Sequence, residues 1–308
     1  MPSGGSELVE QMRRRGLAAA VAVARDLGLP TGDPQVLSGR GNLIVHLAPA
    51  PVVARVATLT AWTRNNPFCW LAHEMAVAEF AAGNDGPVVA PTGLADAGPH
   101  RSDGLAVSLW TWVPPAGAQR QPEPAEAGEA LARLHLAAAG FPGELAFLAP
   151  VRDQIADGLA ALERERVLDS AVLAALRDRH AEVLAGLDLA TAGPAIVLHG
   201  DAHAGNLLQA GAGWLWVDLE ETCRGPREFD LAVLAGQLGA GGAAALAAYA
   251  TATGTPPAEP AALAPFHRGR ELEGAVWSLG MAHQYPERYR ARARILLASV
   301  LRQGENPR

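Results

Sequence analysis

Apolar residues follow two different patterns along the chain, and the change comes near residue 114. Before it, short apolar runs are separated by Gly, Pro and polar clusters, which is typical of strands. Such runs predict strands within residues 37–47, 51–57, 87–92 and 104–113. Residues 96–103 are expected to form a loop before the last of these. Two helices complete this part, one over residues 6–27 and one over 70–82.

Beyond Pro114-Pro115-Ala116-Gly117 the pattern becomes mainly helical. Helices are predicted over 124–139, at two places between 155 and 187, over 230–238 and in a block after Pro265. Asp169-Ser170 is the expected N-cap of the second helix in the 155–187 pair, because both side chains accept hydrogen bonds from helix N–H groups. We therefore predict an α+β fold with a β-rich N-terminal lobe, residues 1–113, and a mostly helical C-terminal lobe, residues 114–308.

One stretch of the second part is not helical. The apolar run 195–198 is short enough to be a buried strand, and it stops at His199-Gly200-Asp201, so a carboxylate stands at the end of a strand. Two further apolar runs flank the turn residues 210–213, which predicts a hairpin that ends on Asp218. Because Asn206 stands just before this hairpin, the hairpin can bring Asp218 back beside it.

An amide and two carboxylates thus converge. The Asn206 amide oxygen and the Asp218 carboxylate are hard donors that suit Mg²⁺, an ion that combines a few protein oxygens with waters and substrate phosphates. Asp201 then remains available to accept a proton. These are the parts of phosphoryl transfer in the kinase manner, in which an Asp orients an acceptor hydroxyl while an Asn and a later Asp hold the metal.

The motif also carries a resemblance. His199-Gly200-Asp201, followed by Asn206, by Val217-Asp218 and by Glu228-Phe229-Asp230, resembles the aminoglycoside phosphotransferase-like branch of the protein-kinase-like superfamily. The resemblance implies a two-lobe kinase-like fold and transfer of the γ-phosphate of ATP or GTP to a hydroxyl of an antibiotic-like or metabolite acceptor. It implies that Asp201 is catalytic, that Asn206 and Asp218 bind Mg²⁺, and that Asp230 braces the catalytic loop. His199 is expected to pack and to shape this loop.

On the nucleotide side, a Gly-rich turn lets backbone N–H groups approach phosphates closely. The resemblance makes it the nucleotide-covering loop, with Ser38, Gly39, Arg40, Gly41 and Asn42. Arg55 stands in a predicted strand where kinases carry a Lys, and Arg also binds phosphate. Glu74 is the expected partner of Arg55 rather than Glu79, because its apolar helix face requires a cation. Trp110 and Trp112 either flank the base or belong to the core.

Four carboxylates are candidates for the acceptor site: Glu220, Glu221, Glu271 and Glu273. The first two follow Asp218 closely and could contact a cationic acceptor, but ion pairs with Arg224 or Arg227 are the favoured alternative. The other two stand in the last helical block, where they either attract an aminated acceptor or are solvated. The sequence specifies neither the acceptor nor the oligomeric state.

Composition narrows the class of protein. The chain has 32 acidic and 25 basic residues, a formal charge of −7, which argues against general nucleic-acid binding. All the basic residues are Arg, and without Lys there is neither a Walker-A loop nor Schiff-base lysine chemistry. The only cysteines, Cys69 and Cys223, are too few for a disulfide framework, so a cytoplasmic location is expected. We expect no membrane span.

Three alternatives remain open at this stage. Arg55 in place of Lys is compatible with a nucleotide-binding pseudo-kinase that has little activity. A metallohydrolase could use His199, Asp201 and His203 as ligands of zinc or iron. A serine hydrolase is disfavoured because the sequence has no G-x-S-x-G motif.

Overall fold

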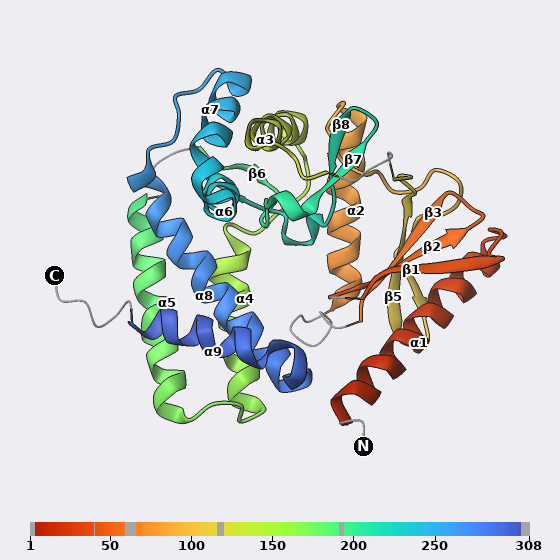
Figure 1. Cartoon of the computed structure of the whole chain (residues 1–308), viewed down its shortest axis with the longest axis horizontal. Coiled ribbons are helices and arrows are strands. Elements are labelled where there is room, and N and C mark those ends of the chain that lie inside the picture. Colours follow the sequence, from red (N-terminus) through yellow and green to blue (C-terminus); the bar gives the residue numbers. More distant parts are fainter. Residues whose placement is uncertain (1–3, 40, 59–65, 116–119, 191–193, 303–308) are drawn as a thin grey trace.

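The fold is seen in a computed structural model, which describes residues 4–39, 41–58, 66–115, 120–190 and 194–302. A five-stranded antiparallel sheet of order β1-β2-β3-β5-β4 forms the first part, and helices dominate the second (Figure 1). The chain has the α+β, two-lobe fold that was predicted. The strands of this sheet are β1 Asp33–Gly39, β2 Leu43–Ala48, β3 Val52–Val56, β4 His100–Ser102 and β5 Leu105–Thr111.

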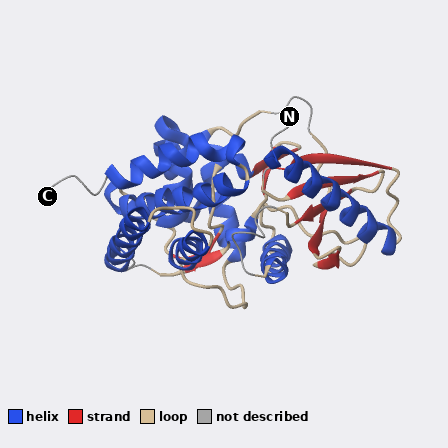
Figure 2. Cartoon of the chain, turned by 90° about the horizontal axis from the view of Figure 1, so that it is seen from below, coloured by secondary structure: helices blue, strands red, loops and turns tan. Residues whose placement is uncertain are grey.

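The N-terminal helix α1, Gly4–Asp26, covers one face of this sheet (Figure 2). Its apolar stripe, which includes Ala20, Val23 and Ala24, packs on buried strand residues such as Val45 and Leu109 to form a core of its own. The helix α2, Pro67–Gly83, stands between the sheet and the second lobe (Figure 1). Both elements were predicted, and α2 begins three residues earlier than expected because Pro67 suits the first turn of a helix.

Two secondary-structure predictions in this lobe were wrong, the strand at 87–92 and the loop at 96–103. Residues 87–92 form no ladder and make only the isolated bridges Val88 to Trp216 and Pro91 to Trp110. Pro87 and Pro91 lack the N–H groups that a strand needs. The expected loop 96–103 instead contains β4, which pairs with β5 through a tight turn at Asp103-Gly104, both with positive φ. An Asp-Gly dipeptide strongly favours a hairpin turn, and the hydrophobic pattern alone does not reveal it.

Seven helices are described in the second lobe: α3 Pro124–Ala138, α4 Ala149–Arg164, α5 Ser170–Ala190, α6 Glu228–Leu238, α7 Gly242–Thr253, α8 Pro260–Gln284 and α9 Pro286–Arg302. The central helix α8 packs against α4, α5, α6 and α9. The predicted helices are present, but α4 begins earlier than expected. The block expected after Pro265 begins at Pro260 and contains Pro265. Asp169 directly precedes α5. The lobe boundary at 113/114 stays a prediction, and residues 116–119 of the proposed hinge lie outside the described residues.

Between α5 and α6 the chain forms two small sheets. Strand β6, Ile196–Leu198, pairs with β9, Cys223–Gly225, and β7, Leu207–Ala210, forms the predicted hairpin with β8, Gly213–Trp216. Single 3₁₀ turns at Ala204–Asn206 and Leu219–Glu221 precede and follow the hairpin. The hairpin β7–β8 lies beside α2 (Figure 1), whereas β6 and β9 pack against α3 and α4.

One segment, Glu228–Thr253, is long and apolar enough by composition to cross a membrane. It comprises α6 and α7, which are interrupted by a 3₁₀ turn at Gly239–Gly241, where Gly239 has positive φ. The helix α6 packs on α8, and α7 packs on α3 and α6. Through these contacts one side of each helix packs within the second lobe, and 28% of the most apolar window is buried.

Candidate active site

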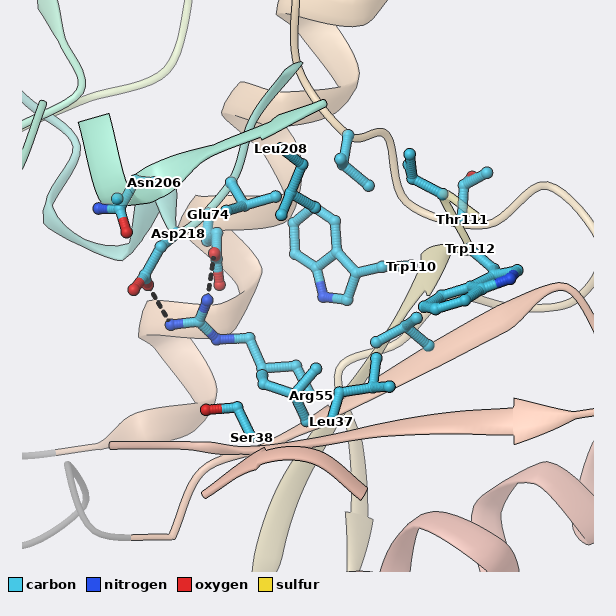
Figure 3. Close-up of a pocket in the computed structure, with 16 residues that line it drawn as sticks. Leu37, Ser38, Arg55, Glu74, Trp110, Thr111, Trp112, Asn206, Leu208 and Asp218 are labelled. Carbon is cyan, nitrogen blue, oxygen red and sulfur yellow. Dashed lines mark hydrogen bonds and ion pairs between the residues drawn. The ribbon is translucent and has the colours of Figure 1, made fainter. Parts of the chain in front are cut away.

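A cavity of about 390 Å³ lies between the sheet and the second lobe. One wall comes from β1, β2, β3, α2 and β5, and the other comes from the hairpin β7–β8 and the residues that flank it (Figure 3). Seven residues that were predicted for the site line the cavity: Ser38, Arg55, Glu74, Trp110, Trp112, Asn206 and Asp218. The strands and hairpin therefore gather side chains that are more than 150 residues apart in the sequence.

Arg55 is the cation of this cavity. Its Nη1 donates to Glu74 Oε1 at 3.0 Å, and its Nη2 donates to Asp218 Oδ1 at 2.5 Å (Figure 3). The same Nη2 also donates to Glu220 Oε2 at 2.6 Å. Burial disfavours the charged guanidinium, but attraction to the three carboxylates outweighs it and raises the pKa of Arg55. The predicted ion pair between Arg55 and Glu74 is therefore present, and it lies in a buried position.

Asp218 owes its position to an unusual backbone conformation. It follows β8 with φ 67° and ψ 51°, a left-handed conformation that Asp tolerates better than most residues, and the chain then enters a 3₁₀ turn. This sharp turn directs the carboxylate toward Arg55. Burial alone would raise the pKa of Asp218, but the charge and hydrogen bond of Arg55 lower it. Asp218 is thus held as a carboxylate.

Asp230 braces the loop that follows β6. It is fully buried at the start of α6, and it accepts hydrogen bonds from His199 N at 2.7 Å, Gly200 N at 2.9 Å and His135 Nε2 at 2.9 Å. Gly200 has φ 86°, and a Cβ there would lie 2.0 Å from the carbonyl oxygen of Glu221. Only glycine fits this position. The bracing hydrogen bonds predicted for Asp230 are confirmed.

His199 is a structural part of the same loop. Its Nε2 donates to the carbonyl of Val217 at 3.1 Å, so Nδ1 carries no proton in the neutral ring and accepts from Asp201 N at 3.3 Å. Burial lowers the pKa of His199, although nearby carboxylates oppose the shift. Both ring nitrogens are used by the backbone, so the metallohydrolase interpretation loses one of its three ligands.

Asp201 and Asn206 are joined within this loop. Asn206 Nδ2 donates to the carbonyl of Asp201 at 3.1 Å, which leaves the amide oxygen of Asn206 on the side of Asp218 (Figure 3). The Asp201 carboxylate contacts Arg270 Nη2 through Oδ1 at 2.6 Å and His203 Nε2 through Oδ2 at 3.6 Å. Burial would raise the pKa of Asp201, but Arg270, His203 and His199 lower it. The fold thus brings Asp201, Asn206 and Asp218 to one place, as their spacing predicted.

The donor set fits a divalent cation such as Mg²⁺. The amide oxygen of Asn206 and the carboxylate of Asp218 face the same space, and the Asp218 side chain is 39% exposed. No group of three His, Cys, Asp or Glu side chains within the described parts of the chain is arranged to hold a metal. The site therefore matches an ion that completes its coordination with substrate phosphates and water, and it does not match a zinc cage.

A model of the phosphotransferase enzyme family matches residues 36–266, most of the chain and the whole of this cavity. The chain belongs to this family. The match covers Asp201, Asn206 and Asp218 as well as Arg55 in the first lobe. It is also consistent with the kinase-like arrangement of the two lobes.

Solved structures share the fold of this phosphotransferase at low identity. A choline/ethanolamine kinase family protein from Mesorhizobium loti has 23% identity and a TM-score of 0.64 over 97% of this chain and 96% of that chain. Amicoumacin kinase, solved with AMP-PNP and Ca²⁺, has 11% identity and a TM-score of 0.64 over 88% of each chain. A macrolide 2′-phosphotransferase from Brachybacterium faecium has 19% identity and a TM-score of 0.56 over 91% and 97%. A search of curated proteins found no match.

The predicted nucleotide-covering loop of the phosphotransferase contacts the same network through Asn42. Asn42 Nδ2 donates to Glu220 Oε2 at 3.0 Å, and this contact joins the turn after β1 to the segment after Asp218. Arg40 lies outside the described residues. Trp110 is buried and donates from its indole to Ser108 Oγ at 2.8 Å, whereas Trp112 stacks on His46 with ring centroids 4.1 Å apart. Both tryptophans border the cavity, and their predicted contact with the base stays a prediction.

The carboxylates proposed for the acceptor side have different surroundings. Glu220 pairs with Arg55, and Glu221 accepts from Gln154 Nε2 at 3.0 Å. The favoured partners were wrong, because Arg224 donates to the carbonyl of Phe141 and Arg227 pairs with Glu228.

On α8, Glu273 Oε2 lies 3.6 Å from Arg270 Nη1 and hence near Asp201, whereas Glu271 is exposed. Arg270 itself was not predicted. It stands 69 residues after Asp201 on a separate helix, and no local spacing connects the two.

Proposed function

We propose that this phosphotransferase is a small-molecule kinase that moves the γ-phosphoryl group of ATP or GTP to a hydroxyl group of an antibiotic-like or metabolite acceptor. The observation that supports this most is the convergence of Asp201, Asn206 and Asp218 beside a cavity whose opposite wall carries Arg55. The family match and the AMP-PNP in the structure of amicoumacin kinase favour a nucleoside triphosphate donor. A cytoplasmic location belongs to the same proposal, because ATP and GTP are available there.

Each residue of the site has a separate role in the proposed reaction. Asp201 orients the acceptor hydroxyl and takes its proton as the oxygen bonds to the γ-phosphorus and the bond to the bridging β–γ oxygen breaks. Arg55 turns from Asp218 and Glu220 toward the nucleotide phosphates and keeps its ion pair with Glu74. Asn206 and Asp218 would hold Mg²⁺, which neutralises charge on the phosphates when it is bound.

This assignment predicts the effect of Asp201→Asn. The amide keeps the shape of the side chain but accepts a proton poorly, so kcat should fall by about 10²–10⁴-fold. Candidate hydroxyl compounds are incubated with the protein, Mg²⁺ and ATP or GTP, and products are identified by the added mass of one phosphoryl group. Nucleotide binding, followed by the thermal shift with AMP-PNP and Mg²⁺, should be retained.

A matched control is Asp178→Asn, which changes an exposed aspartate of α5 away from the cavity and should leave activity intact. Full activity in Asp201→Asn would refute the assigned role. If the wild-type protein binds AMP-PNP but transfers phosphate to no compound, the pseudo-kinase alternative suggested by Arg55 gains support.

A further inference from the structure

Arg270 is a buried cation beside Asp201 that has no role in the reaction as described above. It projects from α8, its side chain is 18% exposed, and its guanidinium carbon lies 5.9 Å from the centre of the buried Phe229 ring. Its Nη2 donates to Asp201 Oδ1 at 2.6 Å. The helix, the ring and the ion pair together define where this guanidinium lies.

The contacts of Asp201 divide between its backbone and its side chain. The backbone is held by Asn206, which bonds to the carbonyl, and by His199, which accepts from the N–H. These bonds leave rotation of the side chain unconstrained. Among the described residues, Arg270 is the group that donates a hydrogen bond to the carboxylate, since His203 Nε2 is 3.6 Å from Oδ2. The hydrogen bond of Arg270 thus engages Oδ1 of the carboxylate.

The second nitrogen of Arg270 argues against a purely structural ion pair. Nη1 is buried and has no hydrogen-bond partner within the described residues, because Glu273 Oε2 is 3.6 Å away. A guanidinium retained only for stability is expected to satisfy both terminal nitrogens, since an unpaired buried donor costs free energy. Arg270 instead directs one good hydrogen bond to the residue that the reaction needs.

Carboxylates on several elements surround Arg270. Burial disfavours its charge, but Glu273 on α8, Asp201, Glu221 and Asp230 together raise its pKa. The guanidinium is therefore a permanent charge whose planar shape is suited to hold a carboxylate in a fixed orientation. A lysine could supply the charge but not the planar contact.

We propose that Arg270 is a positioning residue for Asp201: its bond to Oδ1 sets the orientation of the carboxylate and leaves Oδ2 for the acceptor hydroxyl. This inference rests on the proposed kinase function. Loss of the bond lets the carboxylate rotate away from the acceptor, and a misplacement of this kind reduces turnover while the substrates still bind.

Arg270→Gln and Arg270→Lys test the inference with an acceptor that the wild-type protein phosphorylates. In Arg270→Gln, kcat should fall roughly 10²-fold while KM for the nucleotide stays unchanged. Arg270→Lys should keep an intermediate kcat, about tenfold below wild type, because it retains charge but not the fork geometry. Arg268→Gln, on an exposed position of the same helix, is the matched control and should behave as wild type.

Chemical rescue separates positioning from folding. In Arg270→Ala, added guanidinium at millimolar concentration should restore part of kcat, whereas Asp201→Asn should not respond. A wild-type kcat in both Arg270→Lys and Arg270→Gln overturns the inference, and so does a higher kcat, which would mean that the ion pair restrains Asp201. These outcomes leave the proposed function intact. That function fails separately, if the wild-type protein is inactive or Asp201→Asn is fully active.

Discussion

Arg55 shares one guanidinium among Glu74, Asp218 and Glu220, and its side chain is only 8% exposed. Lysine in kinases meets the same acidic partner with a single ammonium group. The planar guanidinium can bond several carboxylates at once, so it neutralises part of the acidic charge around Asp218. In the proposed function, nucleotide phosphates therefore compete with Asp218 and Glu220 for Arg55.

Removal of Arg55 should expose how much stability this network contributes. Arg55→Met leaves the Glu74 carboxylate, 1% exposed, without its ion partner, so the free energy of unfolding should fall by about 3–5 kcal/mol. The double variant Arg55→Met/Glu74→Gln should lose less than the sum of the single changes. Urea denaturation of the four proteins measures this coupling.

A surface pair serves as the control for that cycle. Arg13 and Glu10 are 3.7 Å apart and about half exposed, so Arg13→Met should change the free energy of unfolding by less than about 1 kcal/mol. Strict additivity of the Arg55 and Glu74 changes would contradict a buried ion pair.

At this scale the predictable residues were those joined by short stretches of chain. Asp201, Asn206 and Asp218 lie within one strand, loop and hairpin, so their spacing nearly determines their geometry. Glu220 was assigned to nearby arginines because local charge pairs are the natural first guess, but the 3₁₀ turn after Asp218 directs it to β3. Arg270 depends on the packing of a distant helix, which no local pattern contains.

Among the elements, α3 and α7 approach each other at a glycine. A Cβ on Gly128 would lie 2.1 Å from the carbonyl oxygen of Ala245, so the two helices cannot keep their spacing with a larger residue. Gly128→Ala should therefore lower the free energy of unfolding by about 1–3 kcal/mol. The helix α3 also carries His135, which bonds to Asp230. The rate of the proposed phosphoryl transfer should therefore fall together with the stability.

Gly274 is the matched control for this helix contact. It lies in α8, and a Cβ added there would meet no atom within 4 Å, so Gly274→Ala should be neutral or should stabilise the protein by up to about 1 kcal/mol. Thermal or urea denaturation of both variants measures whether the loss of stability is specific to Gly128. Equal effects at the two positions would show that helix propensity, and not packing, explains the result.

Element type was most predictable where periodicity extended over several turns. The helices α1, α3 and α5 satisfy both pattern and length, whereas short segments depend on their neighbours. Residues 87–92 look like a strand by composition but contain two prolines, and β4 exists because a tight turn folds three residues onto β5. Pairing of such short pieces is a tertiary effect.

For the whole molecule, buried titratable groups predict how stability depends on pH. Burial lowers the pKa of His199 and of His267, so unfolding takes up protons once the pH falls below the ordinary histidine pKa of about 6.5. The stability that neutral His199 contributes is complete above that value and is lost between it and the lower folded pKa. The pKa values of three buried aspartates, Asp201, Asp218 and Asp230, are also lowered. These groups change the pH dependence of stability only below about pH 4.

Urea denaturation between about pH 7.5 and pH 5 should therefore show falling stability, with a slope of at most about 1.4 kcal/mol per pH unit for each histidine. His199→Gln can still donate to Val217 and accept from Asp201, and it should flatten this slope. His267→Gln, at a half-buried position, should flatten it less. An unchanged slope in His199→Gln would assign the effect to other groups.

The two-lobe arrangement could be anticipated from the change of pattern near residue 114, and so could many residues of the site, but the shape and width of the cavity could not. Its walls combine β1, β3 and β5 with the hairpin β7–β8, and their separation depends on how α2 packs between the lobes. Hydrophobic periodicity says which face of an element is buried, and it does not say which other element covers that face.

The absence of lysine has a practical consequence for anyone who looks for this protein by its chemistry. Acyl-phosphate nucleotide probes mark kinases by acylating a lysine amine near the phosphates, and this sequence offers them no such amine. An occupied cleft would leave Arg55 unlabelled, so surveys built on these reagents will count the protein as a non-binder. Photoreactive nucleotides, which insert into nearby bonds without needing an amine, are the suitable alternative.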